Sequence, residues 1–290
     1  MHAGWEVNNC RIWLCFSLLY LGELAELARR VPGYVQEAER LGDRFASVSQ
    51  RIRLSTICWL VEDNPRGAAE DLQATIASWL PENRGFLIQH FYALTGRGEI
   101  ALYLGQDYLD QVRGKLRAFR RAFLHRVPIA NLEVLHLLGR TALARAATDR
   151  SARARWLAEV HALVRQLERQ RLPLAHNLAR LLEAGASFVE GNLPRTVAAL
   201  RRALADLEAS ETMLYATAAR RRLGETLGAL ASGSPGLAGD EGMALIAQAD
   251  AWYSKQGVKN PARMTAMLVP GWPHPDWPHP DRPPPAPRRT

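Results

Sequence analysis

Apolar residues recur along most of this chain at the three- and four-residue spacing of an α-helix. The spacing is clear in two stretches: Leu24, Leu27, Ala28, Val31 and Val35, and then Val197, Leu200, Leu204 and Leu207. Such a pattern puts the apolar side chains on one face of a helix. The chain has no run of alternating apolar and polar residues of the kind that forms strands. The sequence therefore predicts an all-α protein.

A junction motif recurs, in which an apolar helix end is followed by a small or turn-forming residue. Its markers are Gly22, Asp63, Gly105, Thr148 and Gly191, separated by 41, 42, 43 and 43 residues, and a sixth is expected near Gly236. Helical apolar spacing flanks each marker, so one period of about 43 residues reads as two antiparallel helices. Helix starts are predicted at Asn64-Pro65 and Asn260-Pro261, where a capping side chain precedes a proline.

A single amphipathic helix pair cannot bury its apolar face without a neighbour. We therefore expect six helix pairs and a short C-terminal helix over residues 1–271, stacked as a right-handed superhelical, tetratricopeptide-like solenoid. An irregular helical bundle is the alternative. Beyond 271 the segment Trp272–Asp276 repeats as Trp277–Asp281 and runs into more prolines. Because this proline density opposes helix and sheet, residues 272–290 are predicted to be a disordered Pro-rich tail.

Charge is unevenly distributed. Residues 1–110 carry 10 basic and 14 acidic groups, whereas residues 111–222 carry 21 and 9. A basic middle segment can attract nucleic acid or acidic partners, and a nucleic-acid-associated regulator is one reading of it. We do not favour that reading, because no groove-reading module accompanies the charge.

The three cysteines, Cys10, Cys15 and Cys58, match neither a disulfide framework nor a zinc pattern, which favours a reducing, cytoplasmic compartment. The apolar run from Ile12 to Leu21 is too short to span a bilayer, so no membrane association is expected. The same first helix is apolar on all sides, as if it packed against other sequence or a partner. We expect the protein to associate through it, with either Ile12 or Phe16 facing outward.

No motif for catalysis or cofactor binding is present. The chain lacks a phosphate-binding loop, a dinucleotide fingerprint, a nucleophile elbow and an H-E-x-x-H pair. We therefore predict no catalytic residues, no cofactor and no metal site. The closely spaced Gly96 and Gly98 are interpreted as a locally loosened helix.

Two residue sets are candidates for ligand contact. His90, Glu133 and His176 are spaced 43 residues apart, so they should occupy equivalent places on three successive inner helices and form a polar row along a groove. Surface residues satisfied by local hydrogen bonds are the simpler reading of this row. Phe86, Phe91 and Tyr92 are candidate exposed anchors, although inter-helix packing is the usual role of such aromatics.

Several segments resemble a known family. They are Gly85–Tyr92, Tyr215–Glu225, Ala249–Tyr253, Gln256–Met264 and Met267–Gly271. Together they resemble the end of large bacterial serine/threonine protein kinases of the myxobacterial type. The resemblance runs from about Trp5 to Gly271 and implies a tetratricopeptide-like array that follows a kinase domain and an ATPase-like region. The kinase loops and their lysine are absent, so the resemblance transfers no catalytic residue.

These observations favour a non-catalytic helical-repeat module for protein interaction or ligand sensing in signal transduction, with a protein or peptide as its partner. The alternative is a truncated or split component of a kinase/ATPase enzyme that acts with catalytic domains on another chain. The start of the chain almost directly on a helix is the feature that suggests a split gene.

Overall fold

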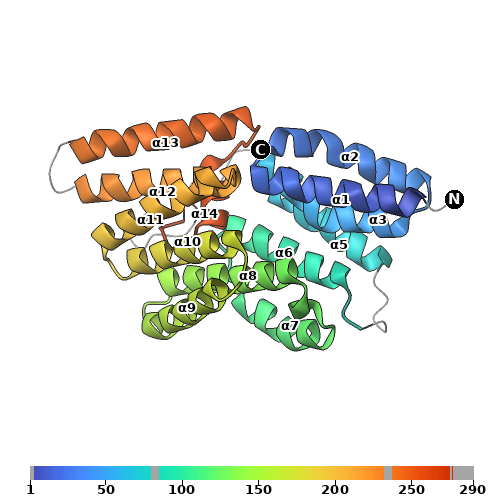
Figure 1. Cartoon of the computed structure of the whole chain (residues 1–290), viewed down its shortest axis with the longest axis horizontal. Helices are drawn as coiled ribbons and strands as arrows, with labels where there is room; N and C mark the ends of the chain where they lie inside the picture. Colours follow the sequence, from blue (N-terminus) through green and yellow to red (C-terminus); the bar gives the residue numbers. More distant parts are fainter. Residues whose placement is uncertain (1–2, 80–84, 232–236, 275, 277–290) are drawn as a thin grey trace, which may run out of the picture.

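The apolar periodicity is realised as a packed array of helices (Figure 1). The computed structural model describes residues 3–79, 85–231, 237–274 and 276. Within these ranges the chain forms helices and connecting turns, with no strand. The helices are α1 (Ala3–Leu21), α2 (Leu24–Arg40), α3 (Arg44–Ser49), η1 (Gln50–Ser55), α4 (Thr56–Val61), α5 (Pro65–Trp79), α6 (Ile88–Tyr103), α7 (Leu109–Arg121), η2 (Leu124–Arg126), α8 (Pro128–Thr148), α9 (Arg153–Glu168), α10 (Pro173–Val189), α11 (Leu193–Ala209), α12 (Met213–Ala231), α13 (Leu237–Lys255) and α14 (Pro261–Leu268). The all-α prediction is confirmed for the part of the chain that is described.

The recurring junctions are turns between consecutive helices. Gly22, Gly105 and Gly191 adopt φ values of 84°, 66° and 80°, in the left-handed region where glycine has no Cβ penalty. Asp63 also lies in this region, at φ 53°, although it carries a Cβ. Its carboxylate accepts a hydrogen bond from Tyr103 Oη at 2.8 Å. The marker expected near Gly236 lies outside the described residues.

The helix starts at Pro65 and Pro261 are confirmed in detail. Asn64 Oδ1 accepts the Gly67 N–H at 2.9 Å, and Asn260 Oδ1 accepts the Arg263 N–H at 3.1 Å. Each asparagine satisfies an N–H that has no partner within its helix, and the proline that follows removes another. This local chemistry sets where α5 and α14 begin.

Two kinds of helix make up the array. Helices such as α2 and α7 bury one apolar stripe, which in α7 includes Leu109, Val112 and Phe119. The helices α6, α8, α10 and α12 are buried along most of their length, because neighbours cover them on more than one side.

Glycines in these buried helices allow close packing. A Cβ at Gly96 would lie 2.8 Å from the Ile52 carbonyl oxygen in η1, and one at Gly98 would lie 2.7 Å from Leu137 Cδ1. Helix α6 is continuous through both positions. The interpretation of Gly96 and Gly98 as a loosened helix is therefore wrong, because they bring α6 against η1 and α8.

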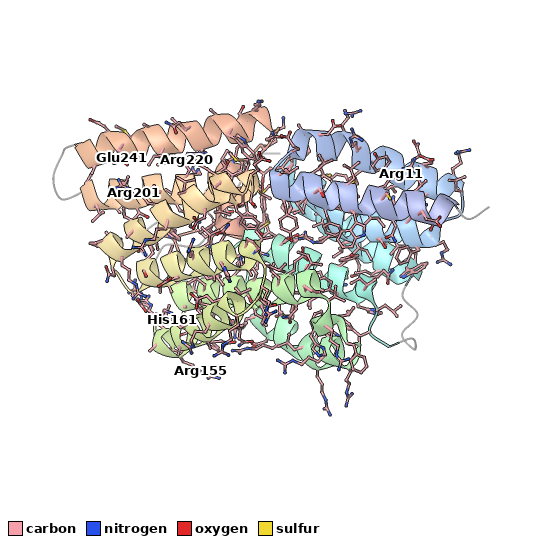
Figure 2. The ribbon with its side chains drawn as sticks, viewed as in Figure 1. Arg11, Arg155, His161, Arg201, Arg220 and Glu241 are labelled. Carbon is pink, nitrogen blue, oxygen red and sulfur yellow. The ribbon has the colours of Figure 1, made fainter. Side chains whose placement is uncertain are left out.

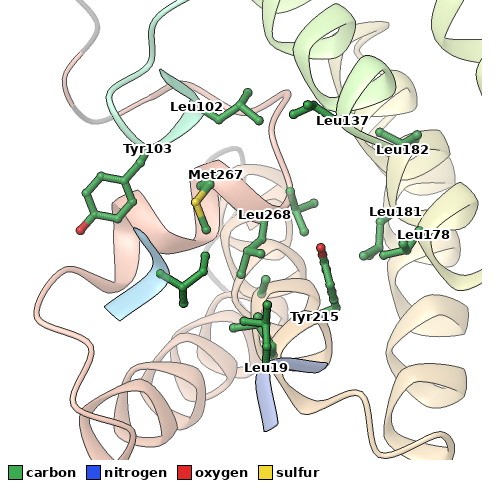
Figure 3. Packing of buried hydrophobic residues seen from close by; sticks show 14 of the residues in the cluster. Leu19, Leu102, Tyr103, Leu137, Leu178, Leu181, Leu182, Tyr215, Met267 and Leu268 are labelled. Carbon is green, nitrogen blue, oxygen red and sulfur yellow. The ribbon is translucent and has the colours of Figure 1, made fainter. Parts of the chain in front are cut away.

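The C-terminal segment enters the interior of the array. Helix α14 packs against α6 and α12, and Figure 3 shows its Met267 and Leu268 among Leu19, Leu102 and Tyr215 from distant parts of the chain. Two buried arginines hold this segment by its backbone. Their contacts run from Arg140 Nη1 to Met267 O at 3.1 Å and from Arg222 Nε to Val269 O at 2.9 Å.

The predicted boundary of the Pro-rich tail needs correction. Trp272 is only 3% exposed, its ring stacks on Phe188 with centroids 4.5 Å apart, and its Nε1 donates to Thr226 Oγ1 at 3.2 Å. His274 is buried, and Asp276 accepts a hydrogen bond from Arg263 Nε at 2.5 Å. The first Trp-Pro-His-Pro-Asp copy is thus part of the packed structure as far as it is described, because its aromatic rings fill interior space. Residues 275 and 277–290 lie outside the described residues.

We expect opposite effects from two helical glycine substitutions. Gly96→Ala should destabilise the protein by about 1–3 kcal/mol, because the new methyl group meets a backbone oxygen and α6 must shift. Gly114→Ala in the exposed part of α7, where no atom lies within 4 Å of the new methyl, should stabilise by up to about 1 kcal/mol through helix propensity. Urea unfolding measures both, and equal stabilisation by the two changes would contradict the close packing of α6 on η1.

Candidate functional site

A cavity of about 680 Å³ opens between α1, α6 and α8, with contributions from α3 and the start of α10. Its walls are mostly aromatic and aliphatic. The lining residues are Asn9, Ile12, Trp13, Phe16, Ser17, Tyr20, Leu21, Phe45, Ser49, Ile88, Phe91, Tyr92, Val127, Ile129, Ala130, Glu133 and Leu174. A volume of this size is typical of small-molecule sites.

Aromatic rings form a continuous wall of the cavity. The centroids of Trp13 and Phe16 lie 6.1 Å apart, those of Phe16 and Tyr92 5.6 Å, and those of Tyr92 and Phe91 5.7 Å. Trp13 is 53% exposed and marks the mouth, where Leu21, Phe45 and Val127 are exposed as well. Exposed apolar residues gathered at an opening are characteristic of a binding groove.

The inner end of the cavity is polar. Glu133 is 9% exposed. Its Oε1 accepts a hydrogen bond from Tyr20 Oη at 2.5 Å, and Arg53 Nη2 lies 3.8 Å from the same oxygen. Burial, and then the neighbouring Glu133 carboxylate, raise the pKa of Tyr20 well above its usual range, so this hydroxyl stays protonated and can donate.

Behind Glu133 lies a buried ion pair. Arg53 Nη1 contacts Glu99 Oε2 at 2.5 Å, and both side chains are buried. Burial raises the pKa of Glu99, and the guanidinium of Arg53 opposes that shift. Removing one member of such a pair strands the other charge in the interior at a cost of about 3–5 kcal/mol.

The π-helix η1 places Arg53 in this cluster. It interrupts the continuous helix formed by α3, η1 and α4, and the wider turn changes which residues face α6 and α8. Gln50 is fully buried, and neither of its side-chain amide atoms has a partner among the described residues. The hydroxyl of Ser49, a lining residue, also lacks one. π-Helical turns and unsatisfied polar groups concentrate at functional sites.

His136 adds a neutral group to the same cluster. It is buried on α8, its ring meets Tyr215 edge-on with centroids 5.6 Å apart, and its Nε2 has no partner within the described part of the chain. Burial, and then the charge of Arg140, lower the pKa of His136 well below its ordinary value. The imidazole is therefore uncharged at neutral pH.

The predicted polar row does not form as one surface. Glu133 lines the cavity, but His90 is half-buried at the start of α6, where its Nδ1 accepts the Leu87 N–H at 2.9 Å. His176 is exposed, with Nε2 3.0 Å from the Glu168 carbonyl oxygen. Equal sequence spacing therefore does not give equal surroundings, because each helix packs against different neighbours.

The predicted aromatic anchors also separate. Phe91 is 1% exposed and belongs to the core, so the usual packing role of such aromatics holds for it and the exposed-anchor alternative does not. Phe86 is half-buried and packs edge-on against Phe119, with centroids 6.4 Å apart. Tyr92 is half-buried in the cavity wall. Helix α7 covers Phe86 and Phe91 through Phe119, which the local sequence did not indicate.

The first helix is oriented differently from our expectation. Ile12 and Phe16 are both buried toward the cavity, so neither faces outward. Among the α1 side chains that the structure describes, the exposed large apolar ones are instead Val7, Trp13, Leu14 and Leu21. None of the described helices is long and apolar enough to cross a membrane.

Sequence reasoning missed Tyr20, Arg53 and Glu99 as site residues. A weak signal was present, since Arg53 stands between Ile52 and Leu54, and Glu99 stands between Gly98 and Ile100. A charged residue inside a buried run implies a partner. The partner itself could not be named, because it lies 46 residues away in the sequence.

Many arginines of the basic middle segment are engaged in ion pairs. Figure 2 labels Arg201, Arg220 and Glu241, which belong to α11, α12 and α13. Arg201 pairs with Glu241 at 2.8 Å and Arg220 with Glu208, while Arg155 lies over the ring of Trp156. The segment therefore presents less free positive charge than its composition indicates.

The described residues contain no group of three or more metal-ligating side chains. Burial raises the pKa of Cys15 to about 11 and that of Cys58 to about 12, so both thiols are protonated at neutral pH.

No protein-family model, curated protein or solved structure matches the chain. The functional interpretation of the cavity therefore rests on the geometry of its own residues.

His136 should make the protein sensitive to acid. The unfolded chain binds a proton near the ordinary pKa of 6.5, whereas folded His136 does so only at much lower pH, so acidification favours unfolding. We expect the wild type to lose up to about 1.4 kcal/mol more per pH unit below 6.5 than His136→Gln, which cannot titrate. Urea unfolding at pH 7, 6 and 5 compares the slopes, and parallel slopes would contradict a neutral buried His136.

Proposed function

We propose that this chain is a non-catalytic helical-repeat module that senses a small, largely apolar molecule bound in the cavity between α1, α6 and α8. The observation that carries the proposal is the open, aromatic-lined volume of about 680 Å³ with a polar inner end. Ligand sites combine these features, an apolar wall that supplies affinity and a few buried polar groups that orient the ligand.

The position of the cavity suits a sensor. Its walls come from α1 at one end of the described chain and from α6 and α8 in the middle, and α1 also packs against α12. A ligand that binds only the folded cavity stabilises these contacts in proportion to the logarithm of its concentration. Occupancy of the site would thereby also affect the contact between α1 and α12.

The wider setting is part of the proposal. We infer a tetratricopeptide-like, right-handed array of the kind found at the end of large serine/threonine protein kinases, acting in the cytoplasm with a protein partner. The exposed Val7 and Leu14 on α1 support a contact surface for such a partner. A split kinase/ATPase enzyme would place the catalytic domains on that partner.

Binding of a neutral apolar dye tests the cavity. Nile red should bind saturably with one site per chain and a blue-shifted emission, because the cavity shields it from water. Ile129→Trp, which adds volume at a half-buried lining position, should weaken binding at least about tenfold, equivalent to about 1.4 kcal/mol.

Leu230→Trp is the matched control, since it makes the same kind of change at a position that is 39% exposed and does not line the cavity. It should bind the dye as the wild type does, and circular dichroism should show equal helicity for all three proteins. Absence of saturable binding, or equal loss in both variants, would refute binding in this cavity.

A further inference from the structure

The inner end of the cavity holds a carboxylate oxygen without a partner. Glu133 Oε1 receives the Tyr20 hydrogen bond and faces Arg53, but Oε2 has no hydrogen bond or ion pair with any described residue. The residue is nine-tenths buried and lines the cavity. At the wall of the cavity this oxygen is an acceptor that is open to a ligand group that donates a hydrogen bond, and hydrogen bonds to a charged group are stronger than neutral ones.

The charge of the cavity wall has one sign. Glu133 is the only acidic or basic side chain among the described lining residues. Arg53 does not line the cavity, and its guanidinium is shared between Glu99 Oε2 at 2.5 Å and Glu133 Oε1 at 3.8 Å. A ligand that reached the inner end would therefore meet a carboxylate before any positive group.

The walls around Glu133 are aromatic. The rings of Trp13, Phe16 and Tyr92 follow one another at 5.6–6.1 Å, and Tyr20 borders the carboxylate itself. The faces of aromatic rings attract cations, especially where water is excluded. Carboxylate and rings thus favour the same ligand charge.

We propose that the ligand is an amphipathic organic cation whose ammonium group donates to Glu133 Oε2 while its apolar body lies along the aromatic wall toward Trp13. This assignment rests on the proposed function, because it names the ligand class of that cavity. An anionic ligand would place its charge against Glu133 with no lining cation to receive it.

Three probes with the same alkyl chain separate charge from apolar burial. In calorimetric titrations of the full chain at pH 7, octylammonium should bind at least about tenfold more tightly than octanol, and octanoate should bind most weakly. If octanol binds as tightly as octylammonium, the cation assignment is overturned while the proposed cavity function stands. If none of the three binds, the proposed function fails with it.

Two variants then locate the effect. Glu133→Gln keeps the size of the side chain but removes its charge, so octylammonium should lose at least about tenfold in affinity while octanol changes less than about twofold. Tyr20→Phe keeps the Glu133 carboxylate and frees Oε1 from its hydrogen bond, so it should retain the preference for octylammonium over octanol.

Two outcomes would contradict the assignment of an organic cation to the cavity. A preference for octylammonium that survives Glu133→Gln would place the cation elsewhere, and tighter binding of octanoate by any of the proteins would assign the inner end to Arg53 instead. Should Glu133→Gln fail to fold, the ranking of the probes by the wild type and by Tyr20→Phe still decides the charge of the ligand.

Discussion

The ion pair between Arg53 and Glu99 constrains the interior of this protein. Two opposite charges lie 2.5 Å apart where water does not reach them, and neither can move without stranding the other. Arg53 reaches Glu99 because η1 widens the helix, and Glu99 reaches Arg53 because Gly96 lets α6 approach η1 closely. The π-helical turn, the glycine contact and the ion pair are therefore parts of one arrangement.

The same interior is completed by the C-terminal segment. Arg140 and Arg222 donate to carbonyl oxygens at Met267 and Val269, so α14 lies inside the array rather than beyond its last helix. A concave groove running the length of a repeat array is the usual binding surface of such proteins. Here α14 and Trp272 fill part of the interior, and the open volume remains on the side of α1, α6 and α8.

This division gives the two halves of the polar cluster different roles. The Arg53–Glu99 pair and His136 are buried, so they affect the free energy of folding and do not contact a ligand. Glu133 lies at the boundary, because its Oε1 accepts a hydrogen bond from Tyr20 and the residue lines the open cavity. A ligand that bound the second oxygen would bind only the folded arrangement of the cluster, which couples binding to its stability.

Local chemistry was enough to predict the helices, their turns at Gly22, Gly105 and Gly191, and the caps at Asn64 and Asn260, because each depends on residues a few positions apart. The repeat spacing also singled out Glu133, but it could not tell Glu133 from His90 and His176, since what a side chain faces depends on how its helix packs against the others. Contacts between distant segments were beyond local pattern. The partner of Arg53, the burial of Phe91 under α7 and the docking of Trp272 on Phe188 arise only when helices far apart in sequence pack together, and that packing creates the cavity.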